Sequence, residues 1–232
     1  MYCLYQRCYF CGAPATTNEH VPPVCLFPEK KDLDDGIDYR KNLITVPSCD
    51  AHNSQKSKND EYLQLILVHG YFNNKAGRDH FSSKVVRALT RRPAMLAALY
   101  DNKTPVTVNT EPTLAVDIDR ERFNRALVHL CQGLCYLHTG KPWPKEIEIH
   151  TPILLVMNDR EADRINTLVT NLCKAVIGCL KNIERRGENP DIFWYQLLVD
   201  ESKDRMLCQM VFYGGFEVFA VSDPKLRAEI VV

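Results

Sequence analysis

The stretch that decides the fold of the first quarter of the chain reads CYFC from Cys8 to Cys11 and CDAH from Cys49 to His52. Each half is a pair of metal-ligand side chains separated by two residues. This spacing lets both members of a pair point at one ion, and three thiolates with one imidazole make a closed tetrahedral zinc site. The alternative is that the cysteines are merely buried and that His52 is a surface residue. We predict a structural zinc ion that holds the N-terminal loops together.

A set of polar side chains lies between and just after the two ligand pairs. In chain order they are Glu19, His20, Asn42, Asn53 and Lys56. A carboxylate, an imidazole, two amides and an ammonium group are the side chains needed to cut a phosphodiester bond with a divalent ion. Taken singly, they also fit a loop histidine, a turn asparagine and a helix N-cap. Their order and spacing together favour the catalytic interpretation.

In this arrangement the chain resembles the HNH endonuclease superfamily, whose ββα-metal module often has the form Cys-x2-Cys, acid-His-x-x-Pro, Asn-Leu and Cys-x2-Cys-Asn-x2-Lys. The resemblance covers residues 3 to about 62, roughly a quarter of the chain. Two positions depart from the pattern, Glu19 where Asp is more frequent and His52 where a fourth cysteine is common. The matching positions are Cys8, Cys11, Glu19, His20, Pro23, Asn42, Leu43, Cys49, His52, Asn53 and Lys56.

The resemblance implies a role for each matching polar residue. His20 would be the general base that activates water for attack on phosphorus. Glu19 and Asn53 would bind one catalytic ion, Mg²⁺ or Mn²⁺, because their ligand atoms are hard oxygens. Asn42 would hold His20 in the productive tautomer, and Lys56 would offset the phosphate charge. The expected activity is hydrolysis of phosphodiester bonds in DNA, above all in duplex DNA.

A basic segment follows this part of the chain. Residues 75–103 include seven cationic side chains and two acids. Lys84, Arg87 and Arg91 would share one face of a helix, and we expect them, with Lys58, to contact the nucleic-acid backbone. The alternative is an ordinary solvated helix face.

The composition is that of a globular protein. The chain has 232 residues, 45% of them hydrophobic, and a formal net charge of zero, so attraction to DNA must come from a local patch. No apolar run reaches membrane-spanning length and no signal-peptide segment is recognisable, which predicts a cytoplasmic protein without a membrane partner. Cys131, Cys135 and His138 would share a helical face, where core packing is favoured over a second metal site.

We expect an α+β protein of three parts: an HNH ββα-metal module at residues 1–75, a basic helical connector at 76–111 and an α+β accessory domain with an antiparallel sheet at 112–232. A polar linker is expected around Glu111-Pro112. The expected helices are 53–71, 79–100 with a break at Pro93, 119–138 and 159–186. The expected strands are 147–157, 192–199, 206–213 and 216–221.

Three functional hypotheses follow. The first is a metal-dependent HNH endonuclease acting on DNA, which the resemblance links to bacterial anti-phage defence or mobile elements. The second is a catalytically inactive, zinc-stabilised adaptor that binds nucleic acid or protein. The third is an RNA-cutting toxin. For residues 112–232 the sequence indicates no ligand, and a homo-oligomer contact or a partner-protein surface is the expectation there.

Overall fold

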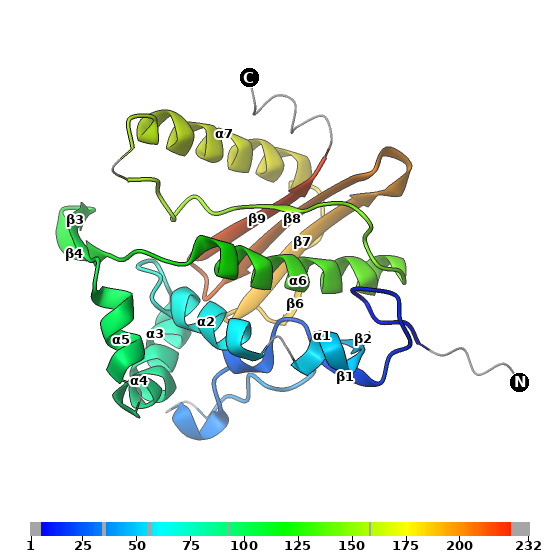
Figure 1. Ribbon diagram of the computed structural model, residues 1–232, viewed down its shortest axis with the longest axis horizontal. Helices are drawn as coiled ribbons and strands as arrows, with labels where there is room; N and C mark the ends of the chain where they lie inside the picture. The colour runs from blue at the N-terminus through cyan, green and yellow to red at the C-terminus, as the bar shows by residue number, and fades with distance from the viewer. Residues whose placement is uncertain (1–5, 34–35, 55–56, 92, 158, 224–232) are drawn as a thin grey trace, which may run out of the picture.

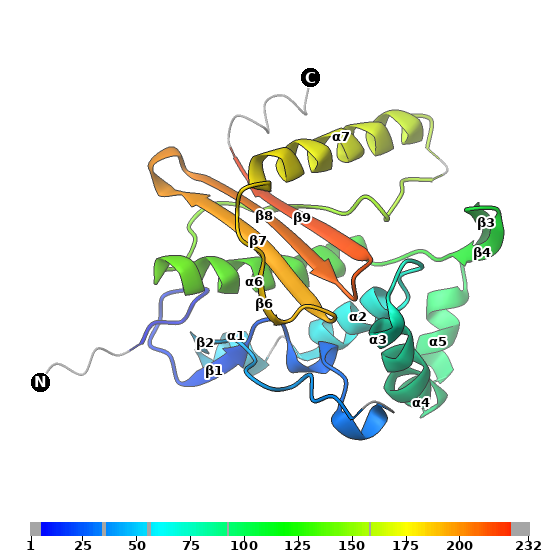
Figure 2. The same cartoon turned by 180° about the vertical axis from the view of Figure 1, so that it is seen from behind.

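A five-stranded antiparallel sheet lies between helices in the computed structural model (Figures 1 and 2). The structure describes residues 6–33, 36–54, 57–91, 93–157 and 159–223. Helix α7 (Ala162–Leu180) covers one face of the sheet, and α6 (Arg120–Thr139) covers the other. The prediction of mixed helix and antiparallel sheet is therefore confirmed. Among the described residues, no helix combines the length and the apolar character that crossing a membrane requires.

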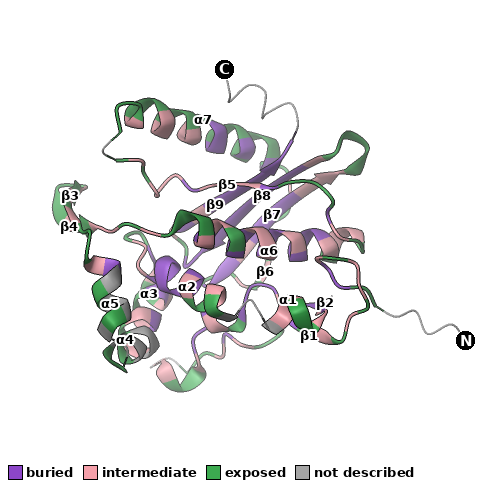
Figure 3. Cartoon of the chain, viewed as in Figure 1, coloured by how far each residue is buried: buried purple, intermediate pink, exposed green. Residues whose placement is uncertain are grey.

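The order of the sheet is β5-β9-β8-β7-β6. Its central strands are buried on both faces (Figure 3), which is why their sequences read as nearly continuous apolar runs. In β8, Leu207 packs with the α7 side and Cys208 with the α6 side, as alternation along a strand requires. The three central strands are those that the sequence predicted. The bounds are β5 Glu148–His150, β6 Arg186–Asn189, β7 Phe193–Asp200, β8 Arg205–Phe212 and β9 Phe216–Ser222.

Both outer strands correct the sequence-based prediction. The strand expected over 147–157 stops at His150, because Pro152 has no amide to donate to a ladder and Leu154 turns back to donate to the Thr151 carbonyl at 3.0 Å. The helix expected over 159–186 ends at Leu180. Residues 186–189 instead form β6, which pairs with β7.

The early end of α7 has a tertiary cause. Gln196 of β7 donates its side-chain amide to the carbonyl of Leu180 at 2.9 Å and also to that of Ile183. These carbonyls lie at and just beyond the helix end, where a helix leaves its last acceptors without partners of its own. A donor from a strand 16 residues away satisfies them. Helical periodicity in the sequence cannot reveal such a partner.

Helix α6 agrees with its capping signals. Asp119 accepts a hydrogen bond from the Arg122 amide at 2.9 Å, and Gly140 follows the helix in a left-handed conformation with φ 71°. The apolar stripe predicted for this helix is fully buried. It consists of Phe123, Leu127, Leu130 and Leu134.

The described residues of the segment predicted as a basic helical connector form short helical stretches and the first strand of a hairpin. The helices are α3 (Lys75–His80), α4 (Val86–Arg91) and α5 (Pro93–Tyr100), with a π-helical stretch, Phe81–Val85, between the first two. The Asn74 side chain caps α3 by accepting from the Gly77 amide at 3.0 Å. The break expected at Pro93 falls beside residue 92, which lies outside the described residues, so it stays a prediction.

The linker expected around Glu111-Pro112 is wrong, because these residues begin a strand. Strand β3 (Thr104–Val108) pairs with β4 (Glu111–Ala115) in an antiparallel hairpin. Its two-residue turn is Asn109-Thr110, with φ of 50° and 70°. A positive φ at both central residues is the hairpin-compatible turn geometry, and Asn109 was the available signal for it.

The N-terminal part has the order strand, strand, helix. Strands β1 (Thr17–His20) and β2 (Thr45–Ser48) pair antiparallel, and α1 (Asp50–Ser54) begins two residues after β2. The helix expected over 53–71 corresponds to α1 and α2 (Ser57–Val68), between which residues 55–56 lie outside the described residues. It also begins three residues earlier than predicted.

One buried core joins the N-terminal part to the sheet. Its members run from Cys8 in the first ligand pair to Ala220 in β9, and α6 lies between these two regions. At the closest approach, a Cβ placed on Gly133 of α6 would lie 2.7 Å from a methyl carbon of Val21, which follows β1. The division at residues 75 and 111 stays a prediction.

Gly133→Ala is expected to lower the free energy of unfolding by about 1–3 kcal/mol, because fully buried Val21 is stiff and cannot move aside. Gly178, in the middle of α7, is the matched control, since its added Cβ would meet nothing within 4 Å. Gly178→Ala should stabilise the protein by about 0.5–1 kcal/mol through helix propensity. Denaturant unfolding of both variants measures the difference. Equal effects would contradict the close packing of α6 on the hairpin.

Candidate metal centre

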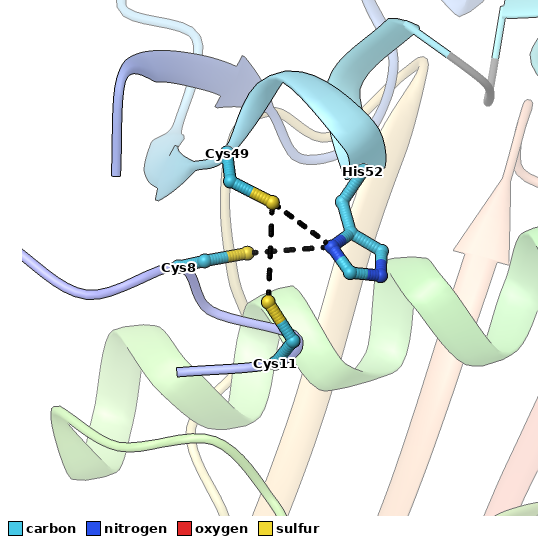
Figure 4. A group of neighbouring side chains, drawn as sticks. All are labelled: Cys8, Cys11, Cys49 and His52. Carbon is cyan, nitrogen blue, oxygen red and sulfur yellow. Dashed lines mark hydrogen bonds between the residues drawn. The ribbon is translucent and has the colours of Figure 1, made fainter. Parts of the chain in front are cut away.

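Four side chains from the two ligand pairs converge beside the β1–β2 hairpin (Figure 4). Cys49 Sγ lies 3.1 Å from His52 Nδ1 and 3.9 Å from Cys11 Sγ. Cys8 Sγ lies 3.8 Å from His52 Nδ1. All four ligand atoms are within 4.8 Å of one another, and no other such group of three or more occurs in the described part of the chain.

These separations suit a tetrahedral ion. With Zn–S near 2.3 Å and Zn–N near 2.0 Å, the vertices of a tetrahedron lie roughly 3.5–3.8 Å apart. The Cys11–Cys49 and Cys8–His52 separations, 3.9 and 3.8 Å, are close to that edge, and the Cys49–His52 separation of 3.1 Å is shorter. The cluster could therefore hold one metal ion such as zinc, with His52 binding through Nδ1.

Local backbone geometry builds each ligand pair. The amide of Gly12 donates to the Cys8 carbonyl at 2.9 Å, and the Cys8 amide donates to the Ala13 carbonyl at 2.7 Å. Gly12 has φ 71°, which glycine adopts without steric cost, so the chain folds back just after Cys11. The second pair occupies the first turn of α1, where the His52 amide donates to the Cys49 carbonyl at 3.0 Å.

Backbone amides point at the thiol of Cys8. Burial alone would raise the pKa of Cys8, but hydrogen bonds from the amides of Cys11, Cys49 and Phe10 outweigh it and leave the pKa below its ordinary value. For Cys11, the Ala13 amide lowers the pKa, whereas burial and the neighbouring thiols Cys8 and Cys49 raise it, and the net direction is upward. Amides aimed at sulfur stabilise a thiolate, the form that binds a metal.

Aromatic rings attach the cluster to α6. The Phe10 ring contacts two imidazoles, with its centroid 4.5 Å from that of His52 and 4.2 Å from that of His129 of α6, and it is nearly parallel to the latter; the two imidazoles lie 6.4 Å apart. The Tyr9 hydroxyl lies 3.4 Å from His129 Nδ1. Sequence reasoning missed all three contacts. Tyr9 and Phe10 stood inside the first ligand pair, but nothing in the sequence pairs them with a residue 120 positions away.

The structure places Glu19 and His20 in different surroundings. They are neighbours on β1, and alternation along a strand sends successive side chains to opposite faces. Glu19 is buried, only 6% exposed, and burial together with the nearby charge of Glu19 raises the pKa of the Tyr9 hydroxyl. His20 is half-buried and makes no hydrogen bond or ion pair with a described residue.

Asn53 lies on the Glu19 side of the hairpin. Its Nδ2 donates to Thr17 Oγ1 at 3.0 Å, and Thr17 is two residues from Glu19 on the same strand face. Asn42 is exposed in a left-handed conformation with φ 54°, and Lys56 lies outside the described residues. Glu19 and Asn53 are thus brought to one face, and no described contact joins either of them to His20.

The structure describes the side chains of three of the four residues predicted to contact nucleic acid. The Arg87 guanidinium lies 2.6 Å from the carboxylate of Asp32, whose side chain is 3% exposed, so part of its charge is used within the protein. Lys58 and Arg91 are exposed. The side chain of Lys84 lies outside the described residues. Nucleic-acid binding by these four residues stays a prediction.

The second cysteine-histidine group behaves as core. Cys131 and Cys135 are fully buried, and Cys131 Sγ contacts Met206 Sδ at 3.7 Å. A hydrogen bond with Cys135 lowers the pKa of Cys131, but one with Cys208 and full burial raise it well above the usual value. Such thiols stay protonated and are poor metal ligands. His138 Nε2 forms a hydrogen bond with the Tyr195 hydroxyl at 3.0 Å.

Comparison with known proteins identifies no relative. The chain matches no protein-family model, no curated protein and no solved structure.

Proposed function

We propose that the protein is a metal-dependent endonuclease of the HNH type that hydrolyses phosphodiester bonds in DNA. One observation carries the proposal. The Cys8, Cys11, Cys49 and His52 cluster joins the loop before β1 to the start of α1, so Glu19 and His20 on β1 and Asn53 on α1 belong to one small unit. We assign zinc to the cluster, in a structural role, because three thiolates and an imidazole close the coordination sphere.

The donor set fits a hard divalent ion such as Mg²⁺ or Mn²⁺. Glu19 supplies carboxylate oxygens and Asn53 an amide oxygen, and the Asn53–Thr17 hydrogen bond keeps Asn53 on the hairpin face that bears Glu19. Glu19 and Asn53 would hold the ion. When bound, it would neutralise charge on the phosphodiester and its leaving oxygen.

The chain's own side chains perform the remaining steps. His20 accepts a proton from the attacking water, a role for which imidazole side chains are suited. Asn42 orients the imidazole, and Lys56 compensates phosphate charge as a point cation. These two roles come from the sequence pattern.

A nicking assay on zinc-loaded protein tests the proposal. Supercoiled plasmid is incubated with Mg²⁺, Mn²⁺ or neither, and single-stranded DNA and RNA are offered in parallel. We expect conversion of supercoiled to open-circular and linear DNA only with the added ion. Cleavage of RNA alone would replace the DNA assignment with an RNA-cutting toxin. Protein that contains one zinc per chain but cleaves none of these substrates would overturn the proposed endonuclease activity.

One observation favours the second candidate, a non-catalytic zinc-stabilised adaptor that binds nucleic acid or protein. Glu19 is only 6% exposed, so water and a hydrated cation have little access to its carboxylate. An adaptor would bind DNA or a protein without cutting it. Retention of labelled duplex without nicking in either ion would support this candidate.

A further inference from the structure

The three thiols of the metal cluster differ in their access to solvent. Cys8 is fully buried, Cys49 is half-buried and Cys11 is exposed. Among the described cysteines outside the cluster, only Cys179 of α7 is also exposed. A dissolved oxidant therefore reaches two described thiols most easily, and one of these two is a cluster ligand.

The two exposed thiols have different neighbours. Cys11 Sγ lies 3.9 Å from Cys49 Sγ, although the two residues are 38 positions apart in the chain (Figure 4). A disulfide bond is near 2.05 Å long, so the two sulfurs need to approach by roughly 2 Å to form one. Within the described part of the chain, no second thiol lies within hydrogen-bond distance of Cys179. Oxidation can therefore end in a local disulfide at Cys11 but not at Cys179.

We propose that Cys11 and Cys49 are an oxidant-sensitive pair, which a hydroperoxide converts to a disulfide so that the cluster releases its zinc. This inference rests on the zinc assignment made with the proposed function. It goes beyond that function, because it adds a modification site that hydrolysis of DNA does not need. Both cysteines bind the ion as thiolates, which is the form that attacks a peroxide.

The oxidation takes place in two steps. The Cys11 thiolate attacks the terminal oxygen of the hydroperoxide, an S–O bond forms, and the O–O bond breaks. Sulfur loses two electrons, and the departing oxygen takes a proton from water. The Cys49 thiolate then attacks the sulfenic acid on Cys11, the S–S bond forms, and hydroxide leaves and is protonated to water. Two thiolates, one hydroperoxide and two protons thus give a disulfide, water and an alcohol, or two waters from hydrogen peroxide.

The disulfide would join the same two segments that the ion joins. Cys11 precedes β1, and Cys49 lies between β2 and α1. Of the four ligands, only Cys8 and His52 would remain, too few to close a tetrahedral site. We therefore expect oxidation to remove the ion and to leave the two segments linked. Oxidised protein should melt at a higher temperature than reduced protein from which a chelator has removed zinc, because only the former keeps a link between them.

Peroxide treatment of reduced, zinc-loaded protein tests the inference. Released zinc is followed with a chromogenic chelator, and free thiols are counted after denaturation. We expect the loss of about one zinc and about two thiols per chain for each hydrogen peroxide consumed. Dithiothreitol with added zinc should restore both.

Peptide mapping of the oxidised wild-type chain locates the bond. Trypsin cleaves after lysine and arginine, so Cys11 is carried by the peptide 8–30 and Cys49 by the peptide 42–56. We expect these two peptides to be joined, and fragmentation should assign the bond to Cys11. A bond to any other cysteine, Cys3 included, would overturn the inference.

Two variants separate the pair from general thiol oxidation. Cys11→His keeps a side chain that binds zinc but has no thiol, and it should release zinc about tenfold more slowly or less. Cys179→Ser removes the other exposed thiol and should release zinc as the wild type does. Equal rates in Cys11→His and the wild type would overturn the inference. If Cys11→His does not fold, the map of the wild-type chain decides.

The outcomes also separate this inference from the proposed function. Wild-type protein that keeps its zinc under peroxide while Cys179 is oxidised overturns the inference alone. Reduced protein that contains no zinc overturns the zinc assignment together with it. None of these measurements uses DNA cleavage, so the endonuclease proposal is judged by the nicking assay.

Discussion

Cys8→Ser protein is expected to bind little zinc and to lose roughly 4 kcal/mol or more of unfolding free energy. Cys8 is fully buried and three backbone amides stabilise its thiolate, so a serine there replaces the thiolate with a neutral hydroxyl and leaves the ion short of a ligand. Cys8 belongs to the same buried core as α6 and the sheet, so the lower stability should affect unfolding of the whole chain. For a chain of this size the melting temperature should fall by about 10 °C.

A cleaner comparison uses two exposed cysteines. Cys11 and Cys179 are both exposed, but only Cys11 belongs to the cluster. Cys11→Ser should lower the zinc content and the melting temperature, and Cys179→Ser on α7 should change neither. Elemental analysis of the purified proteins measures the zinc content, and thermal unfolding measures the melting temperature. If Cys11→Ser keeps a full equivalent of zinc and has the same melting temperature as Cys179→Ser, the cluster holds no structural metal.

His20→Ala is expected to reduce plasmid nicking by about a thousandfold or more while zinc content and stability stay at the wild-type level. Loss of a general base removes proton transfer from the attacking water, an effect of about 10²–10⁴ in rate. Structural side effects should be small, because His20 is half-buried and makes no hydrogen bond or ion pair with a described residue. Zinc content and the unfolding curve measured on the same preparation check this.

His150→Ala is the control for His20. His150 is likewise a half-buried histidine on a short strand, but it lies on β5 in the main sheet, where its neighbour is Glu148 at 3.6 Å. It should retain wild-type nicking. Magnesium-dependent cutting by His20→Ala at a rate near that of His150→Ala would remove His20 from the mechanism and, with it, the HNH proposal.

The two experiments separate the metal cluster from the chemistry. The cysteine variants ask whether an ion holds the hairpin and α1 together, and their readouts need no substrate. The histidine variants ask whether that assembled unit cuts DNA. Zinc-dependent stability with an inactive wild type would leave the adaptor as the function, because the structural ion does not require catalysis.

Local sequence signals predicted the elements that depend on neighbouring residues. The apolar stripe and caps of α6, from Asp119 to Gly140, were recognisable because a helix repeats every 3.6 residues and its ends need defined side chains. The central strands were recognisable because burial on both faces requires continuous apolar sequence. The ligand pair spacing likewise predicted the cluster, since two residues between ligands is a local requirement of coordination.

Other elements could not be predicted, because their partners are distant in the chain. The end of α7 at Leu180 depends on a hydrogen bond from Gln196. The hairpin at 104–115 depends on a two-residue turn, and the polar composition around this turn was interpreted as a linker. The surroundings of Glu19 were also beyond the sequence. Motif order suggested an accessible metal ligand, whereas the fold leaves Glu19 only 6% exposed.

By itself, therefore, the sequence determined which residues gather in the candidate metal cluster and which segments form the central strands and α6, because spacing and periodicity are properties of short stretches of chain. Only the tertiary structure decided that α6 supports the cluster through Phe10 and His129, and that Glu19 and Asn53 share a face of the hairpin. The physical reason is that hydrogen bonding and packing act between atoms a few ångströms apart. A linear pattern does not encode proximity between residues more than a hundred positions apart.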